Sequence, residues 1–163
     1  REAFPDNRII AEDLGFLTDD VRALLAYSGL PGMKVLQFAF QEGSEHLPHL
    51  HKKNSVIYTS THDNDTLRGW AESRPREVAF ADAYLGGTGD IVSRVIGAAL
   101  ASVGDTVIIP LQDWLGVGSA ARINTPATAE GNWRWRLRSG ELPEALAGKI
   151  CALTRLHGRE NAR

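Results

Sequence analysis

The chain has 163 residues, of which 43% are hydrophobic and 23% charged, proportions that are ordinary for a globular domain with a sizeable core. Its formal net charge is −2 and no Lys/Arg stripe stands out, which argues against nucleic acid or an anionic membrane as the main partner. No apolar run approaches the roughly 18 residues of a membrane helix.

The single cysteine, Cys151, cannot form an internal disulfide, so we expect a reducing, cytoplasmic location. The first residues, starting at Arg1, contain neither a start methionine nor the apolar stretch of a signal peptide. They are typical of the middle of a longer chain.

The first part of the chain alternates short apolar runs with one helical segment. We predict strands over 8–11, 33–38 and 55–59, because each is a short run rich in apolar and β-branched residues. A helix is predicted over 18–27, since Thr18 is a good N-cap and glycine and proline follow the last turn. A polar loop with three histidines precedes the third strand.

The second part is mostly helical. In chain order we predict two helices over 65–86 that are broken near Pro75, a helix over 89–103, a strand over 106–111, an irregular segment over 116–140 and a helix over 143–157. Asp65 is expected to cap the helix that begins at Thr66. Cys151 lies on an apolar face of the last helix, where a buried thiol is expected.

Short strands that alternate with helices are typical of parallel βα units and predict an α/β fold. Four such units form either a small doubly wound sheet or half of an eight-stranded barrel. In both architectures the active site lies beyond the carboxyl ends of the strands.

Acids or amides, with aromatic residues nearby, follow all four predicted strands. The strand ends lead into Glu12-Asp13, Phe38 to Glu42, His62 to Asp65, and Gln112-Asp113-Trp114. A rim that combines carboxylates and aromatic rings suits a carbohydrate, and glycosidic chemistry needs a pair of carboxyl groups. Glu12 and Asp63 are the natural pair. A generic α/β binding domain is the competing interpretation.

Other patterns favour structural roles. His46, His49 and His51 lie in a polar loop at a spacing that fits no common zinc site, so no metal is expected. The glycines at 86–89 follow a helix and lack the Lys-Ser/Thr of a phosphate-binding loop. Trp133 and Trp135 alternate in a strand-like run and suit either packing or contact with a sugar.

Five stretches make the chain similar to one family, the 4-alpha-glucanotransferases or amylomaltases of glycoside hydrolase family 77. They are "IIAEDLG" (9–15), "GLPGMKVLQFAF" (29–40), "YTSTHDNDT" (58–66), "PLQDWLGVGSAARIN" (110–124) and "GNWRWRL" (131–137). The resemblance implies that residues 1–163 are the C-terminal portion, about strands five to eight, of a (β/α)8 TIM-type barrel. The family cleaves α-1,4-glucosidic bonds with retention and passes the glucan to another sugar, without a cofactor.

The resemblance also implies roles for individual residues. Glu12 would be the general acid/base, and Asp63 the carboxylate that binds hydroxyls of the distorted sugar and stabilises the transition state. His62 would hydrogen-bond the same sugar. The family nucleophile lies in an Arg-x-Asp-His stretch upstream of the acid/base, and no such stretch occurs here.

The resemblance also implies which residues contact the substrate. Phe38 would contact the sugar near the cleaved bond, Asn124 would lie on the acceptor side, and Asn132 and Trp133 would be structural. The family usually has acids after "FAF", where this chain has Gln41 and Glu42, and Glu42 would still bind sugar hydroxyls. The partner would be a maltooligosaccharide or starch-type α-glucan.

The absent nucleophile leaves three interpretations open. The chain is a fragment of a glucanotransferase that is inactive without the N-terminal half of the barrel, or a non-catalytic α-glucan-binding half-barrel that pairs with a separate first half. The third is a partial sequence with no independent existence.

Overall fold

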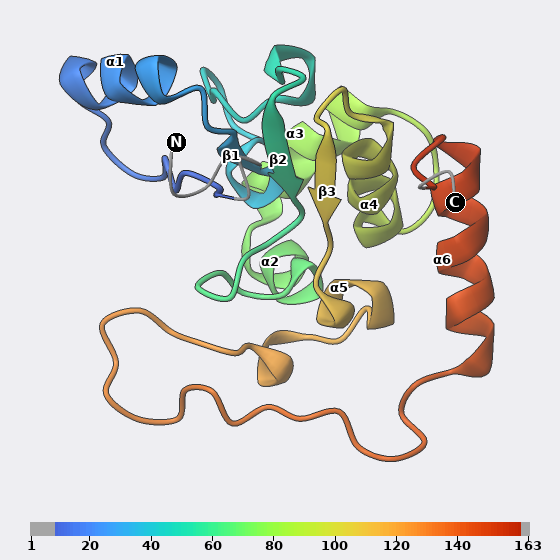
Figure 1. Cartoon of the computed structure of the whole chain (residues 1–163). Coiled ribbons are helices and arrows are strands. Elements are labelled where there is room, and N and C mark those ends of the chain that lie inside the picture. Colours follow the sequence, from blue (N-terminus) through green and yellow to red (C-terminus); the bar gives the residue numbers. More distant parts are fainter. Residues whose placement is uncertain (1–8, 161–163) are drawn as a thin grey trace.

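A parallel sheet of three strands forms the centre of the fold in the computed structural model, which describes residues 9–160 (Figure 1). The strands β1 (Gly32–Val35), β2 (Ser55–Tyr58) and β3 (Thr106–Ile108) are hydrogen-bonded in that order. Gly32 pairs with Ser55, and Val56 with Thr106. Because all three strands are parallel, their carboxyl ends meet at one edge.

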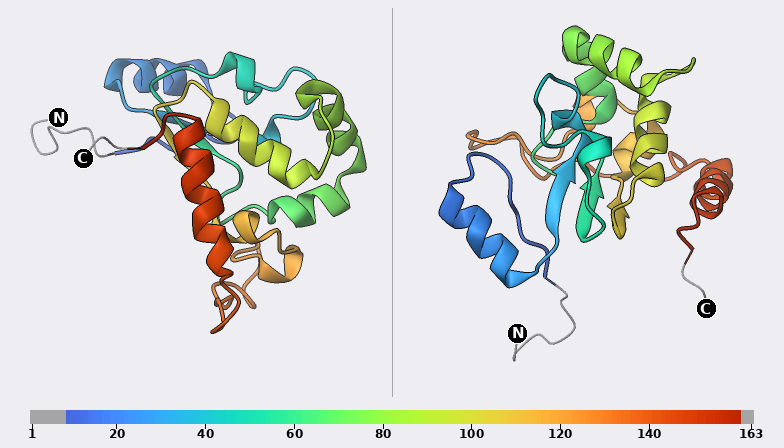
Figure 2. Two further views of the ribbon diagram at one scale, coloured as in Figure 1. Left: turned by 90° about the vertical axis from the view of Figure 1, so that its right-hand side faces the viewer. Right: turned by 90° about the horizontal axis from the view of Figure 1, so that it is seen from above.

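Helices account for most of the remaining ordered structure. They are α1 (Asp19–Ser28), α2 (Leu67–Ser73), α3 (Pro75–Leu85), α4 (Ile91–Ala101), α5 (Leu111–Leu115) and α6 (Glu144–Leu156), with short 3-10 turns η1 (Leu36–Phe38), η2 (Pro48–Leu50) and η3 (Ser119–Ala121). In Figure 1 and in the right-hand view of Figure 2, α1 and α6 lie at opposite ends of the fold. None of the helices in the described part has the length and apolar character needed to cross a bilayer.

The core lies between the sheet and the helices α2, α3 and α4. Its buried side chains include Leu36, Phe40, Ile57, Trp70 and Val95. The predicted helix 89–103 is confirmed as α4, whose Val92, Val95, Ile96 and Ala99 face this core. The α/β class and the parallel arrangement predicted from the sequence are therefore correct.

The strand predictions need correction. No strand forms over residues 9–11, where the Ala11 amide donates one backbone hydrogen bond to the Pro31 carbonyl at 2.9 Å, and residue 8 lies outside the described part. The second and fourth predicted strands are shorter than expected. After Val35 the chain leaves the sheet and forms η1. After Ile108 it reaches Pro110, the N-cap residue of α5.

Two local predictions are also wrong. The N-cap of α2 is Thr66, whose hydroxyl accepts from the Gly69 amide at 3.1 Å, and the Asp65 carboxylate instead accepts from the Thr66 amide at 2.7 Å. Cys151 is exposed, because the part of α6 that packs on α4 presents other residues. The break near Pro75 is confirmed, since α2 ends at Ser73 and α3 begins at the proline.

Candidate active site

The loop after β2 carries the predicted site residues to the carboxyl edge of the sheet. Thr59 and Ser60, directly after the strand, are buried. The Thr61 amide and hydroxyl then donate to the Asn64 side-chain oxygen at 2.9 and 2.8 Å, which closes a tight turn. This turn leaves His62 and Asp63 at its exposed tip.

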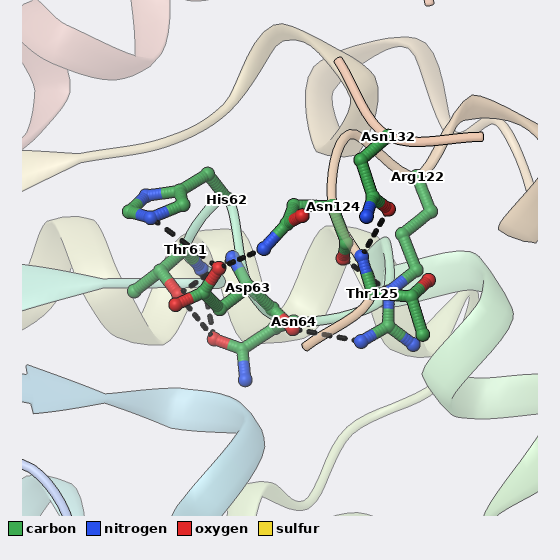
Figure 3. Close-up of polar contacts among 8 residues, drawn as sticks. All are labelled: Thr61, His62, Asp63, Asn64, Arg122, Asn124, Thr125 and Asn132. Carbon is green, nitrogen blue, oxygen red and sulfur yellow. Dashed lines mark hydrogen bonds and ion pairs between the residues drawn. The ribbon is translucent and has the colours of Figure 1, made fainter. Parts of the chain in front are cut away.

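Asp63 has two neighbours that approach the same oxygen (Figure 3). The Asn124 side-chain amide donates to Oδ1 at 2.6 Å, and His62 Nε2 lies 3.4 Å from the same atom. The Asp63 side chain is 49% exposed, and no described residue bonds to its Oδ2. One carboxylate oxygen is therefore fixed by the protein, and the other faces solvent.

Arg122 joins the two chain segments that meet at this site. Its Nη2 donates to the Asp63 carbonyl at 2.7 Å, and its Nε donates to the Asn124 carbonyl at 2.8 Å (Figure 3). No pattern in the sequence marks Arg122 as a site residue, although it lies in the conspicuous stretch 110–124. A planar guanidinium bonds both backbones at once, so it fixes the separation of Asp63 and Asn124.

The segment after Asn124 folds back over the same site. The Trp133 amide donates to the Ile123 carbonyl at 2.7 Å, and the Trp133 ring lies 5.4 Å from that of His62, centre to centre. The Asn132 side-chain oxygen accepts from the Thr125 amide at 2.8 Å. The irregular segment predicted over 116–140 is confirmed here: Trp133 and Trp135 alternate as in a strand, but they lie in a loop in which Trp133 has φ 61°.

A buried carboxylate lies beneath this loop. Asp113 is 1% exposed and accepts three hydrogen bonds, from Thr59 Oγ1 at 2.6 Å, Ser60 Oγ at 2.7 Å and the Leu67 amide at 2.8 Å. It thereby connects α5 to the end of β2 and the start of α2. Asp113 was expected on the exposed rim with the other strand-end acids, and the structure places it in the interior instead.

Burial raises the pKa of Asp113 above its usual value. The hydrogen bonds from Leu67, Thr59 and Ser60 act against burial and lower this pKa, whereas the neighbouring Asp65 raises it. The short distances of these bonds are typical of an ionised acceptor. Asp113 therefore supports the loop from below and has no access to a ligand.

A cleft of about 300 Å³ opens beside Asp63. This rim cleft is lined by Gln37, Phe38, Phe40, Gln41, Asp63, Asn64, Asp65, Trp70, Ser73, Arg74, Glu77 and Arg122. Phe38 is 37% exposed, and its ring makes an edge contact with His46 at 5.6 Å. The predicted aromatic contact and the predicted carboxylate thus share one cleft.

Two predicted site residues lie apart from this cluster. Glu12 and Glu42 are exposed, neither lines the rim cleft, and within residues 9–160 no hydrogen bond or ion pair joins either to Asp63. Glu12 lies near the start of β1, because the adjacent Asp13 accepts from the Met33 amide at 2.6 Å. The pairing of Glu12 with Asp63 stays a prediction.

The three loop histidines bind different protein groups. His46 Nδ1 accepts from the Val35 amide at 3.1 Å, His51 Nε2 lies 2.9 Å from the His46 carbonyl, and His49 Nδ1 lies 2.9 Å from the Tyr84 hydroxyl. Burial lowers the pKa of His46 to about 4. Within the described residues, no group of three or more His, Cys, Asp or Glu side chains is arranged to hold a metal ion.

The fold and this rim define a parallel α/β segment with a carboxylate, an amide and aromatic rings at the carboxyl edge. The family profile described as 4-alpha-glucanotransferase matches residues 1–142. The chain therefore belongs to the 4-alpha-glucanotransferase family, glycoside hydrolase family 77.

Individual relatives agree with this assignment. The chain is 48% identical to the chloroplastic/amyloplastic 4-alpha-glucanotransferase of Arabidopsis thaliana, over 93% of this chain and 28% of the relative. It is 42% identical to the 4-alpha-glucanotransferase of Clostridium butyricum, over 98% of this chain and 34% of the relative. It thus spans about a third or less of the curated relatives that it matches.

A solved structure also matches nearly the whole chain. The amylomaltase of Streptococcus agalactiae in complex with acarbose superposes with a TM-score of 0.91 and 34% identity, over 98% of this chain and 34% of that protein. The observed three-stranded piece is thus similar to one contiguous part of a larger enzyme.

Proposed function

We propose that this chain provides the C-terminal part of the active site of a retaining 4-alpha-glucanotransferase. The parent enzyme would transfer α-1,4-glucan segments between maltooligosaccharides. The observation that carries the proposal is the Asp63 carboxylate, whose Oδ1 is held by Asn124 and whose Oδ2 faces solvent at the carboxyl edge of a parallel sheet. Membership of the family supplies the reaction class.

Asp63 suits the role of a transition-state stabiliser. A carboxylate held by donors on one oxygen keeps the other available for sugar hydroxyls, and its negative charge favours the oxocarbenium-like transition state. His62 lies beside it and is positioned to bind the same sugar ring. Phe38, in the same cleft, offers an aromatic surface to the flat C–H face of a sugar.

In the proposed mechanism, Glu12 protonates the oxygen of the leaving sugar while a carboxylate from outside this chain attacks the anomeric carbon. Glu12 then removes the proton from the acceptor hydroxyl as the acceptor attacks the glycosyl-enzyme bond. Retention requires the two carboxyl groups to be about 5–5.5 Å apart. Glu42 would bind sugar hydroxyls, and Asn124 would lie on the acceptor side.

The three-stranded sheet is the part of the fold that would connect this chain to the rest of the enzyme. We propose that the sheet forms part of the C-terminal half, about strands five to eight, of a (β/α)8 barrel, with residues 9–11 completing a strand when the upstream half is present. The hydrogen bond from the Ala11 amide to the Pro31 carbonyl supports this, because it already holds this segment beside the residue that precedes β1. A cytoplasmic location stays a prediction from the sequence.

A second candidate is a non-catalytic unit that binds α-glucan or pairs with a separate first half. It is favoured by the lack of an Arg-x-Asp-His stretch among the 163 residues. The unpaired edge strands β1 and β3 also offer surfaces for association with another chain.

The two candidates are separated by incubating the purified chain with maltotriose and analysing the products. We expect no glucose and no longer maltooligosaccharides from the chain alone, and both products after the upstream half is added. Transfer by the chain alone would contradict the assignment, because a carboxylate such as Asp63 would then be the nucleophile. Binding without turnover in both conditions would support the non-catalytic unit.

A test of Glu12 uses Glu12→Gln in the reconstituted barrel. We expect transfer to be nearly abolished while maltooligosaccharide binding survives, because a carboxamide still forms hydrogen bonds but is far too weak an acid to protonate the leaving oxygen. Full activity would remove Glu12 from the mechanism.

A further inference from the structure

The rim cleft extends beyond Asp63 to the junction of α2 and α3, a region to which the family resemblance assigns no role. We propose that this outer part, formed by Gln41, Arg74 and Glu77, binds a further glucosyl unit of the α-glucan. The proposal rests on the proposed function, because it extends the same substrate along the surface.

Two buried aromatic residues, Phe40 and Trp70, line the outer cleft. Trp70 is 4% exposed, its ring lies 5.8 Å from that of Phe40, and its Nε1 donates to Glu77 Oε2 at 2.7 Å. This bond fixes one carboxylate oxygen of Glu77, whose side chain lines the cleft and is 29% exposed. Such a preformed surface binds a ligand without first having to be ordered.

The mouth of the cleft carries polar side chains that form few hydrogen bonds within the protein. The Arg74 side chain is 64% exposed and its nearest acid, Glu77 Oε1, is 3.9 Å from Nη1, too far for a hydrogen bond. The Gln41 amide makes only a long contact of 3.5 Å with the Phe38 carbonyl. Both side chains can therefore donate to a ligand, and Gln41 and Glu77 can also accept.

The chemistry of the lining selects a neutral polyhydroxyl ligand. The carboxylates of Asp63, Asp65 and Glu77 outnumber the guanidiniums of Arg74 and Arg122, which disfavours phosphate and other anions. Gln41 occupies a position where 4-alpha-glucanotransferases usually have an acid. Its carboxamide can both donate to and accept from hydroxyl groups. Aromatic rings and mixed hydrogen-bonding groups together suit a glucose ring.

The position of the cleft fixes how this unit connects to the rest of the substrate. Phe38 and Asp63 line the same cleft as Arg74, so a glucan bound at Asp63 continues without a break toward the α2–α3 junction. A volume of about 300 Å³ is at the small end of the range for ligand pockets. The cleft therefore takes a short piece of glucan.

The test measures the affinity of the purified chain for maltose and maltoheptaose by isothermal titration calorimetry. In Arg74→Ala and Gln41→Ala we expect the Kd for maltoheptaose to rise about tenfold, the loss of roughly one hydrogen bond to a charged or polar group. The Kd for maltose should change less than twofold, because the shorter sugar occupies the Asp63 end. The matched control is Arg76→Ala, an exposed arginine of α3 that does not line the cleft.

Each outcome decides the question. If the wild-type chain binds maltoheptaose and both variants bind it with the same Kd, the outer subsite is overturned and the proposed function stays intact. Equal weakening of maltose and maltoheptaose would show a structural role for these residues and would also overturn it. No binding of either sugar by the wild-type chain, with no transfer after the upstream half is added, would overturn the proposed function and the subsite with it.

Discussion

The side-chain amide of Asn124 donates to Oδ1 of Asp63 at 2.6 Å, across a sequence separation of 61 residues. Asp63 comes from the loop after β2, and Asn124 from the irregular segment that follows η3. This bond makes the irregular segment part of the site. It orients an exposed carboxylate whose other neighbour, His62 Nε2, lies at the longer distance of 3.4 Å.

Asn124→Ala is expected to lower transfer without unfolding the chain. The variant removes the hydrogen bond that orients the Asp63 carboxylate, so kcat for maltotriose disproportionation should fall at least about tenfold in the reconstituted barrel, which corresponds to about 1.4 kcal/mol of transition-state stabilisation. The free energy of unfolding should change little, because Asp63 stays solvated.

The matched control is Asn54→Ala, which removes an exposed bond from Asn54 Nδ2 to the Gly29 carbonyl far from the loop. Its kcat should match that of the wild type. If Asn124→Ala retained wild-type kcat, the bond to Asp63 would have no role in transfer.

A pair of helical glycines gives opposite predictions for the same substitution. A Cβ at Gly69 in α2 would approach the Asp65 carboxylate to 2.6 Å and clash with Ser119 Oγ, so Gly69→Ala should destabilise the fold by about 1–3 kcal/mol. A Cβ at Gly97 in α4 would meet nothing within 4 Å, so Gly97→Ala should stabilise it by up to about 1 kcal/mol.

Urea unfolding of the two variants measures both changes. Because Ser119 Oγ donates to Asp65 Oδ2 at 2.7 Å, displacement of these groups in Gly69→Ala should also disturb the adjacent Asp63 loop. Equal stability changes in the two variants would contradict the close approach at Gly69.

The elements that the sequence predicts well are those with a strong local pattern. The apolar run Val56 to Tyr58 predicts β2, and the spacing of apolar residues from Ile91 to Leu100 predicts α4. The polar end of the β2 run also correctly indicates that Asp63 lies at the sheet edge. These features depend on neighbouring residues and are therefore visible in the sequence.

The features that the sequence misses depend on distant residues. Asp113 is buried because Thr59 and Ser60, more than 50 residues earlier, supply its hydrogen bonds. Arg122 belongs to the site because it reaches the Asp63 carbonyl across 59 residues. No local pattern distinguishes these two side chains from surface charges, so only the tertiary structure identifies them.

The His46 ring links stability to pH. Burial, followed by the charge of Lys34, lowers its pKa from 6.5 to about 4, while Asp13 and Glu45 act in the opposite direction. Because the unfolded chain binds the proton more tightly, the stabilisation is complete above pH 6.5 and is lost as the pH falls toward 4. At pH 5 the free energy of unfolding should be lower than at pH 7.5, by about 1 kcal/mol once solvent screening of the partly exposed ring is included.

Urea unfolding at the two pH values tests this, with His46→Phe as the diagnostic variant. It should be less stable at pH 7.5, because the Val35 amide loses its acceptor, and it should depend less on pH. Some dependence will remain, since burial also lowers the pKa of His51. His157→Phe, at the end of α6, is the control, and a wild-type pH dependence in His46→Phe would contradict the assignment.

Asp113 is expected to be the most sensitive position for stability. Asp113→Ala leaves three buried donors without an acceptor, at about 1–3 kcal/mol each, so the loss of about 3–9 kcal/mol should remove a large part of the 5–15 kcal/mol that is ordinary for a domain. Asp113→Asn keeps the shape and one acceptor oxygen, so it should fold with a smaller loss.

The consequence of Asp113→Asn for the site follows from its partners. Thr59 and Ser60 directly precede the turn that carries His62 and Asp63, so a weaker hold on their hydroxyls should loosen that turn. We expect faster amide hydrogen exchange over residues 61–64 and a lower kcat in the reconstituted barrel. Asp20→Asn, an exposed position in α1, should change neither quantity. Wild-type exchange rates in Asp113→Asn would show that the buried carboxylate stabilises the fold without positioning Asp63.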